Sequence, residues 1–240
     1  MPNSLESIFS RTKLALGSLL LSALTVAIGG LIFFGWLTNE MSEGDTRGFD
    51  DAARSFVHQY ASTVLTTLMQ IASFLGSTLF LTIFGIGIFI TFWLFKWHRA
   101  ATLFAITMAG SSILLFTLKN VFRRARPEPF FETLLPASYS FPSGHSLLSF
   151  CFYGALAAII TARIKRRLLR VIIWTCAALL VALIGLSRIY LGVHYPSDVL
   201  AGYTAAIVWV VAIAAAARLL QYRKSNNKER EQIDGLEKKD

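Results

Sequence analysis

Charged residues are scarce in this sequence. Only 15% of its 240 residues are Asp, Glu, Lys or Arg, whereas 55% are hydrophobic. A soluble domain carries about a quarter charged residues, so this composition argues against one. The hydrophobic residues also come in long blocks, and blocks of about 18 or more residues with few charges are typical of membrane spans. We therefore expect an all-α polytopic membrane protein with little mass outside the bilayer.

Cysteine is scarce as well. The sequence has two, Cys151 and Cys176, and both fall inside hydrophobic blocks. No cysteine lies in a connection where a structural disulfide would be natural, and no Cys/His spacing matches a zinc site. Nucleic-acid binding is also disfavoured despite a net charge of +9, because no groove-reading motif or interleaving of aromatic and basic residues is present. We expect both cysteines to be small buried hydrophobes.

Six spans are predicted from the hydrophobic blocks. They are Leu14–Leu37, Ser73–Phe95, Ala100–Leu118, Leu147–Ala162, Val171–Leu186 and Val199–Leu220. The first block is too long for a signal peptide, so we expect an uncleaved helix. Residues 1–222 would then form one six-helix membrane domain, and the polar residues 223–240 a disordered cytoplasmic tail.

Basic residues gather at alternate ends of these spans, which orients them. They are Arg11 and Lys13; Lys96, His98 and Arg99; Arg163, Lys165, Arg166, Arg167 and Arg170; and Arg218, Arg223, Lys224, Lys228 and Arg230. The positive-inside rule makes this side cytoplasmic, with both termini inside. The first connection on the other side, Thr38–Ala72, is acidic. We therefore predict a plasma membrane protein, in a bacterial inner membrane, whose net charge contacts anionic lipid.

One outer connection breaks the charge pattern. The stretch "LKNVFRRARPEPFFETLLPASYSFPSGHS" carries four basic residues where short outer loops usually avoid them. If the third helix continued to Arg126, then Lys119, Arg123 and Arg126 would share one face, at i, i+4 and i+7. Such cations could clamp a phosphate, or they could simply extend to lipid headgroups. This connection alone does not decide between the two.

The link between the last two spans reads "LSRIYLGVHYPSDVLAG". Arg188 ends the fifth span, His194 lies in a short link, and Asp198 opens the sixth. Taken singly, Asp198 could cap a helix dipole and His194 could be an interfacial polar residue. On the predicted topology, however, this link and the preceding outer connection share the outer face. Ionisable groups near the bilayer are costly and tend to be functional, so their gathering predicts a site.

The gathered residue types suit an anion. "PSGH" supplies a helix N-terminus, where Ser143 is the expected N-cap and Gly144 allows close approach of a ligand. Two histidines, His145 and His194, provide a nucleophile or base and an acid. Asp198 can hold one ring nitrogen of His194, fixing its tautomer and favouring the imidazolium. No acidic cluster for a metal lies at this level, so we expect phosphoryl transfer without metal or other cofactor.

Three motifs carry a resemblance to a known family. "KNVFRRARP" fits K-x6-R-P, "PSGH" fits P-S-G-H, and "SRIYLGVHYPSD" fits S-R-x5-H-x3-D. In this order, across Lys119–Asp198, the sequence resembles the type-2 phosphatidic acid phosphatase superfamily. This group contains membrane lipid phosphate phosphatases and is related to vanadium haloperoxidases and bacterial acid phosphatases. The rest of the chain resembles the family only in its six-span layout.

The resemblance implies a role for each matching residue. Lys119, Arg126 and Arg188 would bind the phosphoryl group, with hydrogen bonds from Ser143 and Gly144. His194 would attack phosphorus to form a phosphohistidine, Asp198 would orient His194, and His145 would protonate the leaving alkoxide. The expected substrate is a lipid phosphate or diphosphate, such as undecaprenyl pyrophosphate, phosphatidic acid, phosphatidylglycerophosphate or a lipid A phosphate. The family motif assigns nothing to Arg123 or Arg124.

Other functions remain open from the sequence. A phosphotransferase would need only a lipid or sugar acceptor in place of water. An anion transporter would need charged residues at mid-membrane, which the spans lack, and intact motifs argue against a non-catalytic lipid-binding scaffold. Residues 49–68 show a helical apolar stripe, which predicts an interfacial helix or a border of the route by which lipid reaches the site. Oligomeric state is not indicated.

Overall fold

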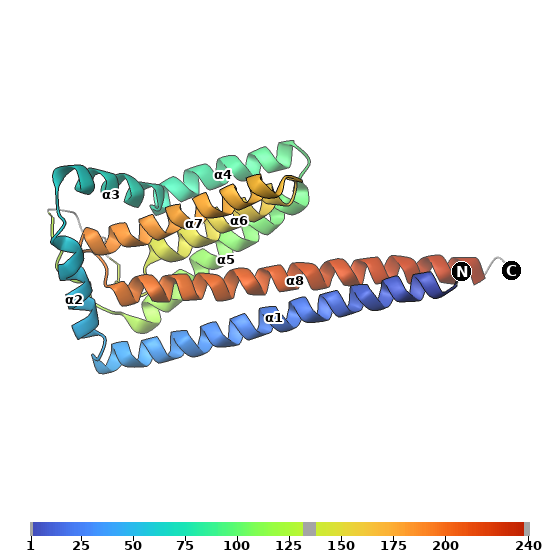
Figure 1. The fold of residues 1–240 in the computed structure, drawn as a ribbon, viewed down its shortest axis with the longest axis horizontal. Coiled ribbons are helices and arrows are strands. Elements are labelled where there is room, and N and C mark those ends of the chain that lie inside the picture. Colours follow the sequence, from blue (N-terminus) through green and yellow to red (C-terminus); the bar gives the residue numbers. More distant parts are fainter. Residues whose placement is uncertain (1, 132–137, 238–240) are drawn as a thin grey trace. The chain divides into compact units, whose positions relative to one another are not determined.

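The computed structural model describes residues 2–131 and 138–237, and every regular element in them is a helix. The elements, drawn in Figure 1, are α1 (Pro2–Glu43), α2 (Arg47–His58), α3 (Thr63–Leu75), α4 (Thr78–Leu94), α5 (His98–Phe122), α6 (Gly144–Thr161), α7 (Arg167–Tyr190) and α8 (Pro196–Glu237). Two compact units are distinguished: residues 1–29 with 211–240, and residues 30–210. The predicted site residues all belong to the second unit.

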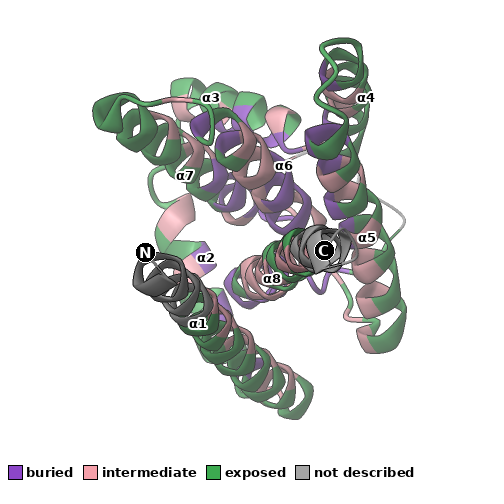
Figure 2. Cartoon of the chain, turned by 90° about the vertical axis from the view of Figure 1, so that its right-hand side faces the viewer, coloured by how far each residue is buried: buried purple, intermediate pink, exposed green. Residues whose placement is uncertain are grey.

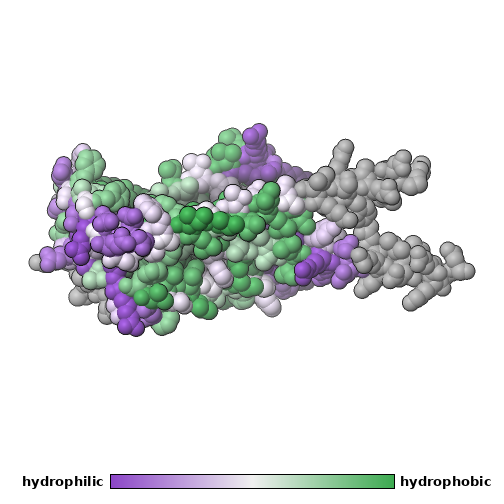
Figure 3. Space-filling model, turned by 90° about the horizontal axis from the view of Figure 1, so that it is seen from below, coloured by the Kyte–Doolittle hydropathy of each residue, from purple (hydrophilic) through white to green (hydrophobic). Residues whose placement is uncertain are grey.

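The all-α membrane fold is confirmed. Five helices are long and apolar enough to cross a bilayer, and α3 with α4 makes a sixth span if the bent pair counts as one. Large apolar side chains on the helices of the second unit are exposed, among them Leu79, Ile113 and Leu179 at 65–67%. One face of the protein, in Figure 3, shows hydrophobic side chains over the middle of the helices and hydrophilic ones toward the ends. Such a surface matches lipid rather than water.

The core of the second unit is built around α6. Its buried residues Leu147, Cys151 and Phe152 pack against Leu81 of α4 and Phe104 of α5. Figure 2 shows buried residues concentrated on α6, with exposed residues on the outer sides of α4 and α7. Cys151 is buried as expected, whereas Cys176 is exposed on α7, and both are free thiols. A helix enclosed by others holds its N-terminal residues rigidly, which matters for the site below.

The second predicted span is broken. Instead of one helix over 73–95, α3 ends at Leu75 and α4 begins at Thr78, with a bend of 48° between them. Ser77 caps α4 by accepting a hydrogen bond from Phe80 N–H at 3.2 Å. A Cβ on Gly76 would lie 2.3 Å from Ile184 Cγ2, so only glycine permits this approach to α7. The break places α3 directly against α7, beside the site.

The third helix also ends before Arg126, the residue to which it would have to continue for Lys119, Arg123 and Arg126 to share one face. α5 stops at Phe122, and Arg123 follows in a left-handed conformation with φ of 46°. The extended chain beyond it is fixed where Ser140 N–H donates to the carbonyl of Arg124 at 2.8 Å. The expectation that Lys119, Arg123 and Arg126 share one helical face is therefore wrong. Arg126 reaches the site from an extended segment, as the avoidance of α geometry before Pro127 favours.

The expected helix over 49–68 is likewise two helices, α2 and α3, separated at residues 59–62. Ser62 caps α3 by accepting from Leu65 N–H at 3.4 Å. In α2 the apolar side chains of Phe49 and Phe56 are exposed, whereas Asp50 and Arg54 are buried. The helix is thus amphipathic with its polar residues turned toward the protein. Asp50 lies in the first turn of α2.

The C-terminal segment differs from expectation. α8 continues to Glu237, so the tail that we expected to be disordered after residue 222 is helical to that point. The segment "RKSNNKEREQ" is rich in Lys, Arg, Glu and Gln and contains no proline. Straight-chain residues of this kind lose little side-chain freedom in a helix, which offsets the lack of an apolar face.

Candidate active site

The predicted site residues come together at one end of the second unit. Four helices and two connections contribute: the last turn of α5, the first turns of α6 and α8, the end of α7, and the chain on either side. Six of the eight predicted residues line one cavity of about 320 Å³: Lys119, Arg126, Gly144, His145, Arg188 and His194. Ser143 and Asp198 are fully buried and do not line this cavity. Segments that are distant in the chain thus form one site.

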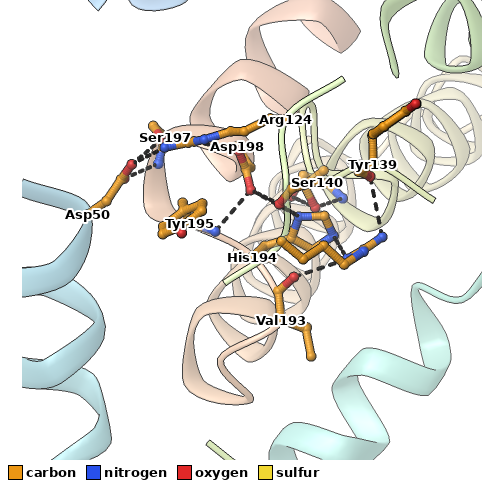
Figure 4. Close-up of polar contacts among 12 residues, drawn as sticks. Asp50, Arg124, Tyr139, Ser140, Val193, His194, Tyr195, Ser197 and Asp198 are labelled. Atoms are coloured by element: carbon orange, nitrogen blue, oxygen red, sulfur yellow. Dashed lines mark hydrogen bonds and ion pairs between the residues drawn. The ribbon is translucent and has the colours of Figure 1, made fainter. Parts of the chain in front are cut away.

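His194 is held between an acid and a guanidinium, and Figure 4 shows it beside the acid, Asp198. Its Nδ1 lies 3.2 Å from Asp198 Oδ2, and its Nε2 lies 3.1 Å from Arg126 Nη1. Asp198 Oδ2 also accepts from Tyr195 N–H at 3.0 Å. Because Arg126 can only donate, Nε2 carries a lone pair and the proton sits on Nδ1, facing Asp198. The cavity side of the imidazole is therefore its basic nitrogen.

The charge state of His194 differs from expectation. The pKa of His194 is lowered to about 4, chiefly by burial and also by the charges of Arg126 and Arg188, whereas Asp198 raises it. We expected Asp198 to favour the imidazolium, and its contribution has that sign, but burial outweighs it. At neutral pH the ring is uncharged, which is the form that a nucleophile needs.

Three cations surround the cavity without a carboxylate partner in the described part of the chain. Lys119 Nζ donates to the carbonyl of Tyr139, Arg188 Nη1 to Ser73 Oγ, and Arg126 Nε to the carbonyl of Ser138 at 2.8 Å. None of the four ion pairs among the described residues involves these three cations: the pairs are Arg54–Asp51, Arg124–Asp50, Arg124–Asp198 and His194–Asp198. Burial lowers the pKa of Arg126, whereas the negative charge of Asp198 raises it.

Arg188 gives the clearest sign of an anion site. Arg188 is 7% exposed, and its buried Nε has no hydrogen-bond partner among the described residues. A buried donor left unpaired costs about 1–3 kcal/mol, more when charged, so such groups are rare unless a ligand satisfies them. Arg188 lines the cavity together with Lys119 and Arg126. The arrangement fits a phosphoryl group, which offers several anionic oxygens to converging donors.

The N-terminus of α6 borders the same cavity. Ser143 is its N-cap, accepting from Ser146 N–H at 3.4 Å, while Ser143 N–H donates to the carbonyl of Asp198 at 2.9 Å. Gly144 and His145 line the cavity, so the first turn of α6 directs its free N–H groups and dipole there. The hydroxyl of Ser143 is used within the helix end, and its hydrogen bond to phosphate stays a prediction.

A profile of the PAP2 superfamily matches residues 100–222, about half of the chain. The chain belongs to the PAP2 superfamily. Among curated relatives, phosphatidylglycerophosphatase B of Bacillus subtilis (strain 168) is 31% identical over 148 residues, covering 58% of this chain and 69% of the relative. An undecaprenyl-diphosphatase of Sulfolobus acidocaldarius is 32% identical, covering 56% and 66%. A lipid A 1-phosphatase of Rhizobium johnstonii is 33% identical, covering 45% and 43%.

Solved structures support the PAP2 fold. A crystal structure of a transmembrane PAP2 type phosphatidylglycerolphosphate phosphatase from Bacillus subtilis superposes with a TM-score of 0.74 at 23% identity, covering 80% of this chain and 96% of that one. Aquifex aeolicus LpxE superposes with a TM-score of 0.53 at 23% identity, covering 70% and 95%. At this identity the likeness concerns the fold alone.

Sequence reasoning missed several residues of the PAP2 site. Ser140 donates to Asp198 Oδ2, and its hydroxyl lies 3.3 Å from His194 Nδ1. Ser73 of α3 meets Arg188, and Arg124 bridges two acids. A serine or arginine outside the three motifs carries no signal of its role in a single sequence. The run "RRAR" signals only that cations gather, and which of them faces the site depends on where α5 ends.

Metal ligation finds no support among the residues that the structure describes. No group of three or more His, Cys, Asp or Glu side chains in residues 16–131 and 138–227 has the arrangement of a metal site. Asp198 is already surrounded by donors, because Arg124, His194 and Tyr195 all contact its carboxylate. Lys119, Arg126 and Arg188 occupy the places beside the cavity where a cation would neutralise phosphate.

Proposed function

We propose that this PAP2 protein dephosphorylates a membrane lipid phosphate or diphosphate through a phosphohistidine on His194, without a metal ion. At the level of class, family membership makes it a lipid phosphate phosphatase, and the proposal concerns the substrate and the chemistry. The observation that carries it is the position of His194 Nε2. This uncharged nitrogen borders a cavity that also holds three cations without a carboxylate partner among the described residues.

The first half-reaction breaks the phosphorus–oxygen bond to the lipid. Lys119, Arg126 and Arg188 bind the phosphoryl oxygens and stabilise the charge that spreads over them in the transition state. His194 Nε2 forms a bond to phosphorus, and its Nδ1 proton remains on the side of Asp198, which stabilises the developing positive charge. His145, in the same cavity, takes up a proton when the anionic phosphoryl group binds beside it, and this imidazolium gives the proton to the departing alkoxide or phosphate oxygen.

The second half-reaction restores the enzyme. His145, now without its proton, takes one from a water molecule as the water oxygen attacks phosphorus. The phosphorus–nitrogen bond breaks, inorganic phosphate forms, and His194 Nε2 regains its lone pair. If a lipid or sugar hydroxyl replaced water, the same step would make the protein a phosphotransferase.

The cavity lining favours a lipid over a soluble substrate. Beside the cations it includes apolar side chains of α5 and α6, namely Leu115, Phe116 and Leu148. Phe116 is 71% exposed on the apolar outer surface of α5, so this side of the cavity continues toward the bilayer. In a substrate with a phosphate at the end of an alkyl or prenyl chain, the phosphate would contact the cations, and the chain would contact these apolar side chains.

The relatives named above indicate which lipids to test. They act on phosphatidylglycerophosphate, undecaprenyl diphosphate and the 1-phosphate of lipid A, by their names. From the charge pattern we expect the site at the outer, periplasmic or extracellular, boundary of a bacterial plasma membrane, with both termini in the cytoplasm. The substrate would then be a lipid of the outer leaflet.

Phosphate release from purified protein, across a panel of these lipids and with a chelator present, tests the proposal. His194→Ala should abolish release while the protein remains folded in detergent. His98→Ala is a matched control, because His98 is exposed at the first residue of α5. Acid-labile, base-stable radiolabel on the protein after brief exposure to substrate would identify a phosphohistidine. Full activity of His194→Ala would refute the nucleophile, and loss of wild-type activity with chelator would refute the metal-free reaction.

A further inference from the structure

Arg124 lies between two fully buried carboxylates from different parts of the chain. Its Nη1 is 2.7 Å from Asp198 Oδ1 on α8, and its Nη2 is 2.7 Å from Asp50 Oδ2 on α2. The Arg124 side chain is 13% exposed, and both carboxylates are inaccessible. Figure 4 shows Asp50, Arg124 and Asp198 in one line of contacts that continues to His194.

Asp50 makes further contacts with the start of α8. Its Oδ1 accepts from Ser197 N–H at 2.9 Å, and its Oδ2 accepts from the Ser197 hydroxyl at 2.6 Å. Arg124 Nη1 donates to the same hydroxyl at 2.7 Å. Ser197 directly precedes Asp198, so Asp50 and Arg124 together fix the first turn of α8. The guanidinium of Arg124 also lies 4.1 Å from the ring centre of Tyr195.

This arrangement divides the Asp198 carboxylate between two tasks. Oδ1 faces Arg124, which leaves Oδ2 for His194 Nδ1 at 3.2 Å. A bidentate or bridging arginine fixes the rotation of a carboxylate more tightly than a single hydrogen bond does. Neither Arg124 nor Asp50 lines the cavity, so neither would touch phosphate.

We infer that Asp50 and Arg124 are positioning residues of this enzyme, which set the orientation of Asp198 and, through it, of His194. The inference rests on the proposed function of His194. It gives α2 a task that its sequence did not indicate. The exposed apolar side chains of α2 face away from the protein, whereas the buried Asp50 contacts Arg124, which in turn contacts Asp198.

Charge provides a signature that a purely structural role would lack. Around His194 the charged and titratable groups are Lys119 of α5, Arg124 and Arg126 of the connection, His145 of α6, Arg188 of α7 and Asp198 of α8. Arg124 offsets part of the negative charge of Asp198, so its loss should raise the pKa of His194. Loss of the Asp50 charge should have the opposite effect, because Arg124 would then act on Asp198 alone.

Arg124→Gln is the first test. Misplacing a reacting group by about 1 Å costs about 100-fold in rate, so we expect kcat to fall by that order. The low-pH midpoint of kcat/KM should move up by about one pH unit. Arg124→Lys keeps the charge but not the planar fork, so kcat should fall about tenfold with the midpoint unchanged. Arg123→Gln is the matched control, because Arg123 is exposed and, among the described residues, its side chain donates to the carbonyl of Asn120 in α5.

Asp50→Asn is the second test. We expect kcat to fall about tenfold and the low-pH midpoint to move down by about half a unit, opposite to Arg124→Gln. Asp51→Asn is its control, because the Asp51 side chain is 66% exposed and 3.8 Å from Arg54. Elution as a single species in detergent and thermal stability should show that each variant is folded.

Two results would overturn the inference. One is a kcat within twofold of wild type in both Arg124→Lys and Asp50→Asn. The other is reduced activity of Arg124→Gln and Asp50→Asn without opposite shifts of the low-pH midpoint of kcat/KM. If Arg124→Gln does not fold, the two remaining variants decide: the inference requires a lower kcat with an unchanged midpoint in Arg124→Lys, and a lower kcat with a lower midpoint in Asp50→Asn. His194→Ala separates this inference from the proposed function. Full activity there would refute the nucleophile itself, whereas an inactive His194→Ala with active Arg124 and Asp50 variants would refute only the positioning.

Discussion

Arg126 Nη1 lies 3.1 Å from His194 Nε2, so the nitrogen that faces the cavity is paired with a cation rather than an acid. An imidazolium at this place would meet a like charge, and the neutral ring is favoured. The same guanidinium reaches the carbonyls of Ser138 and Val193, which keeps it beside the cavity. The proposed phosphate-binding cation, Arg126, and the proposed nucleophile, His194, are therefore in direct contact.

This pairing predicts the pH dependence of the enzyme. Burial lowers the pKa of His194 to about 4, so the ring is neutral and reactive above that pH and protonated below it. We expect kcat/KM, corrected for ionisation of the substrate, to stay level down to about pH 5 and to fall through a midpoint near pH 4. Arg126→Gln should raise the midpoint, because it removes a positive charge. A midpoint near 6.5 in the wild-type enzyme would contradict the buried, cation-flanked geometry.

The approach of α8 to α6 predicts a steric requirement at Gly202. A Cβ there would lie 2.7 Å from the carbonyl oxygen of Ser143 and 2.9 Å from Ser146 Cβ. Gly202→Ala should push the N-terminus of α6 away from α8 and reduce kcat by about tenfold or more. Gly154→Ala, in the middle of α6 with no atom within 4 Å of the new Cβ, should leave activity unchanged. Equal activity of the two variants would show that α6 tolerates the displacement.

The unpaired Nε of Arg188 predicts how product binds. Inorganic phosphate should inhibit the enzyme, and Arg188→Lys should weaken that inhibition by about tenfold or more, because charge-assisted hydrogen bonds contribute about 1.5–3 kcal/mol each. The measurement is the inhibition constant for phosphate at neutral pH. Arg123→Lys, at an exposed arginine, should keep the wild-type constant. An unchanged constant in Arg188→Lys would place phosphate elsewhere.

The sequence predicted the residues of the site better than the shape of the chain around them. Lys119, Arg126 and Arg188 were identified from motif and topology, and they do line one cavity. The end of α5 at Phe122 was not identified, because a left-handed Arg123 depends on the pairing of Arg124 with Ser140. The bend at Gly76 likewise depends on a contact with Ile184 of a distant helix. Hydropathy reports burial in lipid and is insensitive to such tertiary contacts.

The role of Asp50 also depends on tertiary contacts that the sequence does not reveal. In the sequence it is one of several acids in an outer connection, and its neighbour Asp51 has the same type and the same helix. Only the partner distinguishes them: Asp50 is fully buried on Arg124 and Ser197, whereas Asp51 is exposed. A partner 147 residues away in the chain has no local signature.

The exposed edge of the cavity predicts which variants separate lipid from soluble substrates. Phe116 lines the cavity and is 71% exposed, whereas Ile113, one turn earlier on α5, is 67% exposed and does not line it. Phe116→Ala removes apolar contact worth about 1 kcal/mol or more with a bound chain, so KM for a long-chain lipid phosphate should rise several-fold. Hydrolysis of a short-chain, water-soluble phosphate should be unaffected, and Ile113→Ala should change neither. The comparison is made at one detergent concentration, since micelles dilute only the lipid. Equal effects of Phe116→Ala on both substrates would mean that Phe116 shapes the site without contacting the chain, and that the lipid leaves the cavity by another side.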